Sequence, residues 1–453
     1  MKNLAFLGCL LAASAFAEPV ITDNVTFEQT NQLVKIAYTL ENEPAIVTID
    51  ILSNGVTVTG QAFSNPEMVC GPWNRKLDPG DYEVVWRPDA TWANTYLKNG
   101  TVSVRVQAWA TNTPPDYMVV DLTSTTNIMF ATSTNALPGG IDSDLYRTSY
   151  LVMRRCPAKD VVWYMGSGTS KGVNPKHKVK FSEDYYFGVF PTTQMQYKNL
   201  NGNTAHDCYF TNRWECRAVD SLGLVNMRGK VCATNWPHNT PLHKVDADTP
   251  LDRLRKKTGL EFDLPTSAQW EFACRAGVAG TLNSGAAQTQ AEVERLGRVK
   301  TNGGWAPEAA GWPEATSGSV KRWRDDSPRT KEPYCHARAW STEYGTPRVG
   351  SYAPNDWGIY DLYGNLWEIT TDHTPTYDYD SEYKTTYVDP VGEENRDLWG
   401  GTAQTYSMRD GSNWFNAWSS ANSAGVTTSS SGGDLVRSAC RLACPAVIPA
   451  DVK

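Results

Sequence analysis

The chain has 453 residues and a formal net charge of -7 at pH 7, and 40% of its residues are hydrophobic. This length predicts two or three domains with substantial cores. The mild acidity, without any run of basic residues, argues against a nucleic-acid partner. After the N-terminus, no segment approaches the roughly 20 apolar residues that a membrane helix needs, so no transmembrane segment is expected.

The N-terminus has the features of a cleavable signal peptide over residues 1–17. Lys2 supplies the positive charge, a short apolar stretch follows it, and an Ala-Phe-Ala cleavage site ends at Ala17. The mature chain is therefore expected to begin at Glu18 and to be exported. It would be secreted or held in the periplasm or cell envelope.

Cysteine usage fits this compartment. In an exported protein, disulfides are the first interpretation of a cysteine-rich sequence. The cysteines beyond the cleavage site are Cys70, Cys156, Cys208, Cys216, Cys232, Cys274, Cys335, Cys440 and Cys444. Their odd number leaves at least one thiol free or paired with another chain. No pair has Cys-x-x-Cys spacing, so disulfides are expected rather than a zinc site.

Residues 18–135 are predicted to form an all-β domain. Short runs rich in β-branched and aromatic residues, such as VKIAYTL and TVSVRVQAWA, alternate with turn signals such as Asn54-Gly55 and Asn99-Gly100. Regular short strands with such turns favour an immunoglobulin-like β-sandwich. This domain carries no catalytic motif, so a spacing or docking role is expected for it.

The pattern changes after a segment rich in Thr, Ser, Asn and Gly at 122–144, and a second domain is expected over 147–453. Four helices there begin with a threonine cap, and three of the caps are followed at the third position by Gln or Glu. The four caps are Thr193, Thr249, Thr266 and Thr289. Long stretches rich in Gly, Pro and Trp join these helices, which indicates an α+β domain with much irregular structure.

Three segments of this second domain resemble, in order, the signatures of one family. They are FDLPTSAQWEFACRAG (262–277), VGSYAPNDWGIYDLYGNLWEITTD (349–372) and the closing segment from SMRDGSNWF to RSACRLACP (407–445). The family is that of the formylglycine-generating enzymes, also called sulfatase-modifying factors, and the resemblance extends over about 147–445. It implies a loop-rich variant of the C-type lectin-like fold. It also implies a family activity, the oxygen-dependent oxidation of a sulfatase cysteine to formylglycine.

The resemblance further implies a structural calcium ion in the stretch GIYDLYGNLWEITTD (358–372). The ligands would be the Asp361 side chain, the Gly364 and Leu366 carbonyls, and the Glu368 carboxylate. Calcium takes about six to eight oxygen ligands, and acids mixed with carbonyls of an irregular loop can supply them. The alternative is that the two acids cap backbone amides and pair with Arg or Lys.

The catalytic metal, in contrast, is not expected. Family enzymes bind Cu(I) through two cysteines spaced Cys-x-x-x-x-Cys after a Gly-Gly-Ser turn, and thiolates suit this soft ion. In this chain the two positions fall on Phe415 and Ser420, and no other register of the segment supplies a cysteine. Cys440 and Cys444 are spaced one residue too closely to substitute, and an exported structural disulfide is the default interpretation for them.

The segment that follows the position of the family's Gly-Gly-Ser turn is instead a candidate ligand cleft. Its residues are Arg409, Ser412, Asn413, Trp414, Phe415, Trp418 and Ser420. Exposed tryptophans in a cleft suit peptide or glycan ligands. For Trp414 a core position is favoured, whereas for Trp418 both positions stay open. The leading hypothesis is a non-catalytic, exported binding or scaffold module. The alternatives are a working copper- and oxygen-dependent oxidase and an envelope structural protein that docks through its β-sandwich.

Overall fold

The computed structural model describes residues 17–22, 24–92, 97, 101–124, 128–167, 175–204, 216–219, 222–229, 245–302, 346–373, 385–390, 405–409, 426–430 and 438–452. The signal peptide up to residue 16 lies outside the described residues. So do the predicted cleft residues other than Arg409, namely Ser412, Asn413, Trp414, Phe415, Trp418 and Ser420. Among the described helices, none has the length and apolar character needed to cross a membrane.

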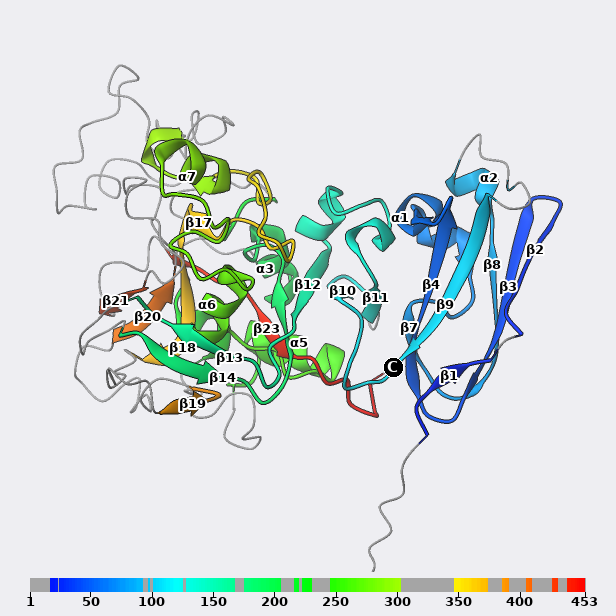
Figure 1. The fold of residues 1–453 in the computed structure, drawn as a ribbon, viewed down its shortest axis with the longest axis horizontal. Coiled ribbons are helices and arrows are strands. Elements are labelled where there is room, and N and C mark those ends of the chain that lie inside the picture. The colour runs from blue at the N-terminus through cyan, green and yellow to red at the C-terminus, as the bar shows by residue number, and fades with distance from the viewer. Residues whose placement is uncertain are drawn as a thin grey trace, which may run out of the picture.

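Two β-sheets that share one apolar core form the N-terminal domain (Figure 1). One sheet has the order β1-β3-β8-β6 with β2 beside β3, and the other has the order β5-β4-β7 with β9 beside β4. The strands are β1 (Val20–Ile21), β2 (Thr26–Thr30), β3 (Leu33–Glu41), β4 (Ala45–Ser53), β5 (Val56–Thr57), β6 (Val69–Cys70), β7 (Arg75–Leu77), β8 (Gly80–Trp86) and β9 (Val102–Trp109). The short helices are α1 (Thr59–Ala62), α2 (Pro88–Thr91) and the 3-10 helix η1 (Pro66–Met68).

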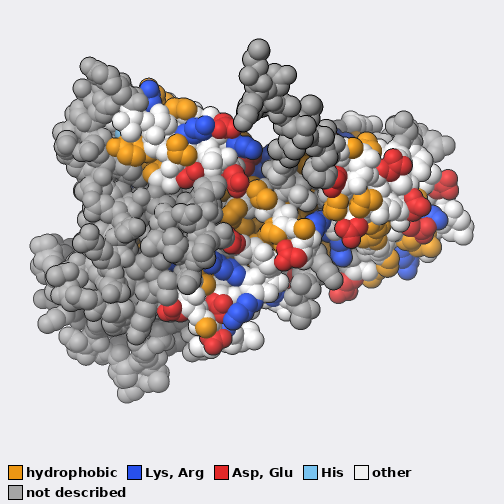
Figure 2. Space-filling view, turned by 90° about the horizontal axis from the view of Figure 1, so that it is seen from below, with side chains coloured by type: hydrophobic (Ala, Val, Ile, Leu, Met, Phe, Trp, Pro, Cys, Tyr) orange, Lys and Arg blue, Asp and Glu red, His pale blue; other side chains and the backbone are white. Residues whose placement is uncertain are grey.

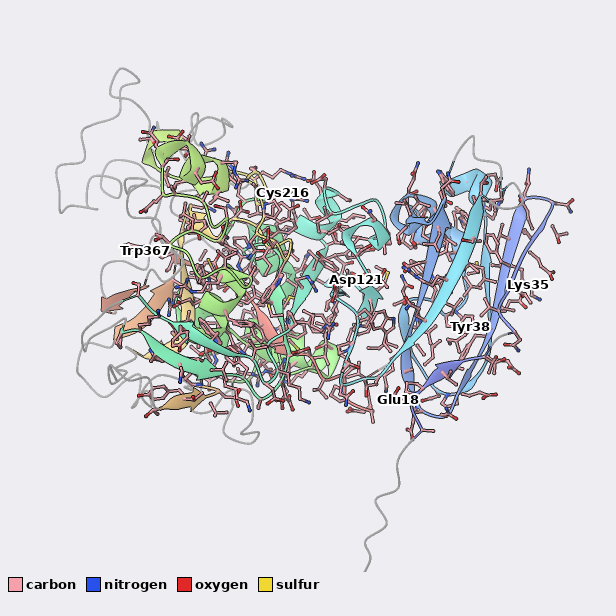
Figure 3. The ribbon with its side chains drawn as sticks, viewed as in Figure 1. Glu18, Lys35, Tyr38, Asp121, Cys216 and Trp367 are labelled. Atoms are coloured by element: carbon pink, nitrogen blue, oxygen red, sulfur yellow. The ribbon has the colours of Figure 1, made fainter. Side chains whose placement is uncertain are left out.

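Alternation along the strands explains this core. Successive side chains of a strand point to opposite faces, so every second residue of β3 is buried between the sheets. Tyr38 points inward, whereas Lys35 points outward to solvent (Figure 3). Outside the core, acidic and basic side chains are interspersed over this domain (Figure 2). The predicted β-sheet character of this part is confirmed, with three short helical turns between the strands, and the immunoglobulin-like topology stays a prediction.

The second domain mixes helices with four sheets. The largest sheet is antiparallel with the order β11-β10-β12-β15-β23, and the others have the orders β21-β20-β18-β22, β13-β14-β19 and β16-β17. The strands are β10 (Tyr117–Asp121), β11 (Ile128–Ala131), β12 (Tyr150–Cys156), β13 (Val162–Met165), β14 (His177–Lys180), β15 (Tyr185–Gly188), β16 (Gly297–Arg298), β17 (Tyr363–Gly364), β18 (Trp367–His373), β19 (Thr386–Val388), β20 (Thr405–Arg409), β21 (Val426–Ser430), β22 (Ser438–Ala439) and β23 (Ala443–Pro445). The helices are α3 (Gln194–Leu200), α4 (Leu224–Arg228), α5 (Pro250–Thr258), α6 (Ser267–Arg275), α7 (Gln290–Leu296) and the 3-10 helices η2 (Thr134–Ala136), η3 (Asp144–Arg147) and η4 (Lys300–Asn302).

Strands β10 and β11 differ from the sequence-based division of the chain. Both strands lie within residues 18–135, the range that the sequence predicts for the N-terminal domain. In the structure β10 pairs over its whole length with β12, from Tyr117 opposite Arg154 to Asp121 opposite Tyr150. The two strands therefore belong to the largest sheet of the second domain. Their apolar side chains, including Met118 and Val120, are buried in its core.

The two domains are joined by several contacts besides the connecting chain. The Phe130 amide of β11 donates to the Asn74 carbonyl at 2.8 Å. Lys76 Nζ donates to the carbonyl of Val452 at 3.0 Å, near the C-terminus, which lies between the two domains (Figure 1). Gly60 approaches the second domain so closely that a Cβ there would lie 2.2 Å from the Leu137 oxygen. These contacts fix the N-terminal sheets against the domain that carries the family signatures.

Candidate functional site

The stretch 358–372 turns sharply between β17 and β18. β17 runs parallel to β16, and a Cβ on Gly364 would lie 1.8 Å from the Arg298 oxygen of that neighbour. Gly364 also has a φ of +70°, which residues with a side chain rarely adopt. Both reasons demand glycine at this position. The turn that it permits places Asp361 and Glu368 inside the domain, 5% and 3% exposed.

Glu368 is bonded by two side chains from distant parts of the chain. Trp270 Nε1 on α6 donates to Glu368 Oε2 at 2.6 Å. Arg441 Nη2 lies 2.8 Å from Oε1, and Arg441 Nε lies 3.0 Å from Oε2. All three side chains are buried. The carboxylate is thus neutralised by a fork-shaped ion pair, and both of its oxygens are already hydrogen-bonded.

Arg441 also joins the loops that surround this ion pair. Its Nη1 donates to the carbonyls of Gly188 and Val189 at 2.9 and 3.0 Å, and its Nη2 donates to the Tyr360 carbonyl at 2.9 Å. Buried carbonyls need such donors where no strand partner supplies them. Sequence reasoning did not assign Arg441 to the site, and the Arg-Leu pair in the closing family segment is the signal that could have found it.

Asp361 has a different environment. The Gly350 amide donates to Asp361 Oδ2 at 2.5 Å, and Oδ1 is buried without a hydrogen-bond partner. Burial raises the pKa of this carboxyl to about 6, although the Gly350 amide and the charge of Arg441 act in the opposite direction. The side-chain oxygen of the nearby Asn365 is likewise buried without a partner.

The predicted calcium ligands fit this geometry only in part. An unpartnered, buried carboxylate oxygen such as Asp361 Oδ1 is an atom that a cation would satisfy. Glu368 does not fit, because a cation beside it would have to share the carboxylate with the Arg441 guanidinium. Among the described residues, no group of three or more His, Cys, Asp or Glu side chains is placed to hold a metal ion. The pairing of Glu368 with arginine matches the alternative weighed from the sequence.

Helix α6 is the rigid support behind Glu368. Thr266 Oγ1 accepts from the Gln269 amide at 3.1 Å and Gln269 Oε1 accepts from the Thr266 amide at 2.9 Å, so the predicted capping box is confirmed. Every residue of the helix is buried. The helix is therefore surrounded by protein on all sides.

Arg409, the one described residue of the predicted cleft, is bonded to this helix. Its Nη1 donates to Glu271 Oε2 at 2.8 Å and its Nε donates to Ser267 Oγ at 2.6 Å. Glu271 Oε1 accepts from Arg275 Nε at 2.8 Å and from the Gly166 amide at 2.9 Å. Arg409 is only 1% exposed. Its guanidinium is thus part of the packing of α6 and does not line a solvent-facing cleft.

The cysteines differ from the expected disulfide framework. No disulfide joins any of the six cysteines that the structure describes, which are Cys70, Cys156, Cys216, Cys274, Cys440 and Cys444. Cys440 and Cys444 lie in the same apolar core, and burial raises the pKa of Cys440 to about 12 and that of Cys444 further still. Both side chains are therefore neutral thiols near pH 7 and are enclosed by apolar groups.

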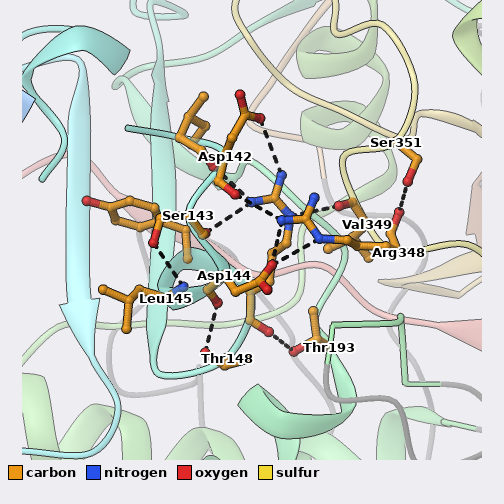
Figure 4. A network of polar contacts seen from close by, with 12 residues as sticks. Asp142, Ser143, Asp144, Leu145, Thr148, Thr193, Arg348, Val349 and Ser351 are labelled. Carbon is orange, nitrogen blue, oxygen red and sulfur yellow. Dashed lines mark hydrogen bonds and ion pairs between the residues drawn. The ribbon is translucent and has the colours of Figure 1, made fainter. Parts of the chain in front are cut away.

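A second polar network lies at the entry to the domain (Figure 4). Arg348 Nε lies 3.0 Å from Asp144 Oδ1. The buried Arg147 donates from Nε to the Val349 carbonyl at 2.8 Å, and its own carbonyl accepts from Thr193 Oγ1 at 2.6 Å. These bonds join η3 and α3 to the start of the 349–372 signature. No local pattern in the sequence indicates these bonds, because the partners are 46 to 204 residues apart.

Comparison with known proteins identifies the family of the second domain. Residues 159–439 match the model of the sulfatase-modifying factor enzyme 1-like domain. The match covers more than half of the chain, so the chain belongs to this family. This confirms the resemblance found in the three sequence signatures.

Individual relatives are more distant. Formylglycine-generating enzyme of Bos taurus is 26% identical over 151 residues, which are 31% of this chain and 33% of that protein. The chain thus spans about a third of the length of this curated relative. Among solved structures, PvdO from Pseudomonas aeruginosa is 16% identical with a TM-score of 0.39, over 65% of this chain and 94% of that chain. Treponema denticola variable protein 1 is 17% identical with a TM-score of 0.40, over 66% and 96%.

Proposed function

We propose that this protein is an exported, non-catalytic member of its family that acts as a binding or scaffold module. The carrying observation is that the positions of the family's copper-binding cysteine pair hold Phe415 and Ser420. A phenyl ring cannot bind Cu(I), and a serine hydroxyl is a poor ligand for so soft an ion. Without copper, the oxygen-dependent oxidation of a cysteine has no catalytic centre.

The state of the remaining thiols supports this proposal. Cys440 and Cys444 are the pair that could have replaced the lost ligands. Both are buried in the apolar core, and their raised pKa values keep them protonated. Activity of the kind named for the bovine relative therefore stays the alternative, and no described residue favours it.

A ligand site after Arg409 is part of the proposal. The tryptophans at 414 and 418 would stack on a peptide or a glycan, since aromatic rings offer both an apolar face and a polar edge. Arg409 itself would have a structural role and would not contact the ligand, because its guanidinium is hydrogen-bonded to Glu271 and Ser267. Its role would be to hold β20 against α6, so that the segment that follows starts from a rigid strand.

A structural calcium ion is also part of the proposal, with a smaller set of ligands than the sequence predicted. These ligands are the Asp361 side chain and the backbone carbonyls of Gly364 and Leu366. The support is the buried, unpartnered Asp361 Oδ1. Glu368 is left out of the ligand set because Arg441 already neutralises it. In such a site the ion would only hold the turn together. The test is to measure the calcium content of the purified protein and of two variants, Asp361→Asn and Glu368→Gln. It distinguishes Asp361 as a calcium ligand from Glu368 as the partner of Arg441. Calcium should be lost from the first variant and kept by any folded form of the second.

The function itself is tested by Cu(I) titration and by an oxidation assay. The purified chain should show no tight, stoichiometric Cu(I) site, and it should leave a cysteine-containing sulfatase peptide unchanged under oxygen. Tight one-to-one copper binding that disappears in a Cys440→Ser/Cys444→Ser variant, together with formylglycine formation, would replace this proposal with the oxidase.

A further inference from the structure

Strand β11 forms one end of the largest sheet of the second domain. Within the described part of the chain, β10 is the only strand that pairs with it. The outer edge of such a strand directs the amides and carbonyls of alternate residues away from its own sheet, where another chain can pair with them. The sequence of β11, Ile-Met-Phe-Ala, contains neither the charge nor the proline that commonly protects such an edge. If uncovered, this edge would be suited to pairing with a strand of another molecule.

The N-terminal domain covers this edge in the folded chain. Strand β11 contacts β4 and β7 of that domain, and it lies on the side of the second domain that faces them (Figure 1). The Phe130 amide donates to the carbonyl of Asn74, which directly precedes β7, at 2.8 Å. Asn74 has a φ of +52°, which asparagine tolerates better than most residues, and its own Oδ1 accepts from the Ile49 amide of β4 at 2.8 Å. The asparagine therefore bonds to β4 through its side chain and to β11 through its backbone.

A buried carboxylate makes a second attachment to the same strand. Asp50 on β4 is 1% exposed, and both of its oxygens lie 3.0 Å from Oγ1 of Thr132, the residue after β11. Arg105 Nη2 on β9 lies 2.6 Å from Asp50 Oδ2, so the charge of the acid is neutralised within its own domain. The Thr132 hydroxyl therefore donates a charge-assisted hydrogen bond across the junction, and such bonds are stronger than those between neutral groups.

Apolar packing holds β11 on both of its faces. Successive side chains of a strand point to opposite faces. Ile128 and Phe130 lie in a core cluster of the second domain that also includes Ile46 of β4. Met129, between them, packs against the core of the N-terminal domain. The strand is thus fixed to the N-terminal domain by side chains of both faces as well as by the hydrogen bonds at Phe130 and Thr132.

We propose that the N-terminal domain is a built-in cover for the edge of β11, and that it keeps this strand from pairing with β11 of a second copy of the chain. A cover of this kind adds an intramolecular role to the spacing or docking role that the sequence predicts. When the junction opens, the edge gains free amide and carbonyl groups, and two uncharged copies of β11 can pair without repulsion. This role is separate from the proposed function, which concerns the copper positions and the segment after Arg409.

The test measures self-association of the full chain without its predicted signal peptide. Light scattering follows the protein in urea below its unfolding transition, where circular dichroism shows that the fold is kept. Thr132→Val keeps the shape of the side chain and removes its hydroxyl. The opened form should then be populated about tenfold more, and association should be faster by at least about this factor. Lys76→Met, which removes the bond to the Val452 carbonyl, should accelerate association by a smaller factor, about threefold.

Two further variants separate the proposed cover from a general loss of stability. Thr148→Val removes a hydroxyl that donates to the Asp144 carbonyl inside the second domain. Compared at equal free energy of unfolding, this control should associate like the original chain. Thr132→Val/Met129→Lys places a charge on β11 and should associate no faster than the original chain, although it weakens packing at the junction.

Association of Thr148→Val as fast as that of Thr132→Val, or an unchanged rate for Thr132→Val, would overturn the proposal. So would fast association of the double variant, or an associated form in which hydrogen exchange shows protection of β2 instead of β11. The Cu(I) and oxidation assays do not depend on this junction, so failure here and failure of the proposed function are separate results.

Discussion

In the N-terminal domain, Trp86 and Phe63 are among the largest fully buried side chains, whereas in the second domain this group includes five arginines. These are Arg147, Arg217, Arg228, Arg409 and Arg441. The N-terminal core is built of alternating apolar residues on two sheets. The second domain has apolar cores as well, but it places ion pairs such as Arg441–Glu368 and Arg228–Asp263 inside them.

The difference follows from how each domain satisfies its backbone. Strands in a sheet bond one another, so the interior between the N-terminal sheets is mainly apolar. The exception is the buried Asp50, which pairs with Arg105 at 2.6 Å. Loops have no such regular partners. In the loop-rich second domain, Arg441 donates to the carbonyls of Gly188, Val189 and Tyr360, and Arg147 donates to that of Val349. Buried arginines such as Arg441 therefore do here what β-ladders do in the N-terminal domain, and Arg228, Arg409 and Arg441 are each balanced by a buried acid.

The sharpest test of this comparison is Arg441→Met. It leaves the Glu368 charge and several carbonyls buried without a partner, so it should lower the free energy of unfolding by about 3–5 kcal/mol. Urea unfolding at pH 7 measures this loss. The double variant Arg441→Met/Glu368→Gln should recover part of it, because the uncompensated charge is gone. A loss below about 1 kcal/mol would show that this ion pair does not hold the loops together.

Shortening an apolar side chain in the N-terminal core gives the loss of unfolding free energy to compare with that of Arg441→Met. Ile36 is fully buried between the two sheets. Ile36→Ala should cost about 2–5 kcal/mol through lost burial and the cavity left behind. Unlike the arginine variant, it should show the same loss at pH 5 and pH 7, because no charge is uncovered. A marked pH dependence would contradict the purely apolar account of this core.

The raised pKa of Asp361 predicts that the stability of the second domain depends on pH. Its pKa is raised by burial to about 6, above the usual value of about 3.9 for an unfolded chain. The folded state therefore binds a proton more readily, and stability in chelator-treated protein should fall as pH rises from about 4 to about 6. The linked change is on the order of 2–3 kcal/mol. Asp361→Asn should flatten this part of the pH profile of urea unfolding. An unchanged slope would assign it to other groups.

The capping box of α6 provides a smaller test. Thr266→Ala removes the hydroxyl that accepts from the Gln269 amide and should lower stability by about 0.5–2 kcal/mol. Thr266→Ser keeps an oxygen at that place and serves as the control. If both variants lose the same amount, packing of the methyl group and not capping determines the effect.

The smallest effect is expected at a surface ion pair of the N-terminal domain. Lys35 lies near Glu83, with both side chains about half exposed. Lys35→Met should change stability by less than about 1 kcal/mol, and salt should screen even that. Thermal unfolding at low and high salt measures it. A loss as large as that of Arg441→Met would remove the distinction between buried and exposed pairs on which the comparison rests.

Local signals determined much of the fold from sequence. The alternating runs at 34–40 and 101–110 became β3 and β9, and threonine caps at 193 and 266 start α3 and α6. These predictions succeeded because the causes lie within a few residues. Side-chain alternation defines a strand, and a hydroxyl three positions before an amide defines a helix start. The family signatures added the identity of the second domain.

Only the tertiary structure decided which partners the buried charges and the boundary strands take. Glu368 could bind calcium or an arginine by sequence, and its partner Arg441 is 73 residues away. Strand β10 is a short apolar run that follows the N-terminal strands in the sequence, yet it pairs with β12 of the second domain. The same holds for Arg409, which was predicted in a cleft and is buried against α6. Sequence fixes what a residue can bond to, whereas the packing of distant segments determines which of the possible partners comes within reach.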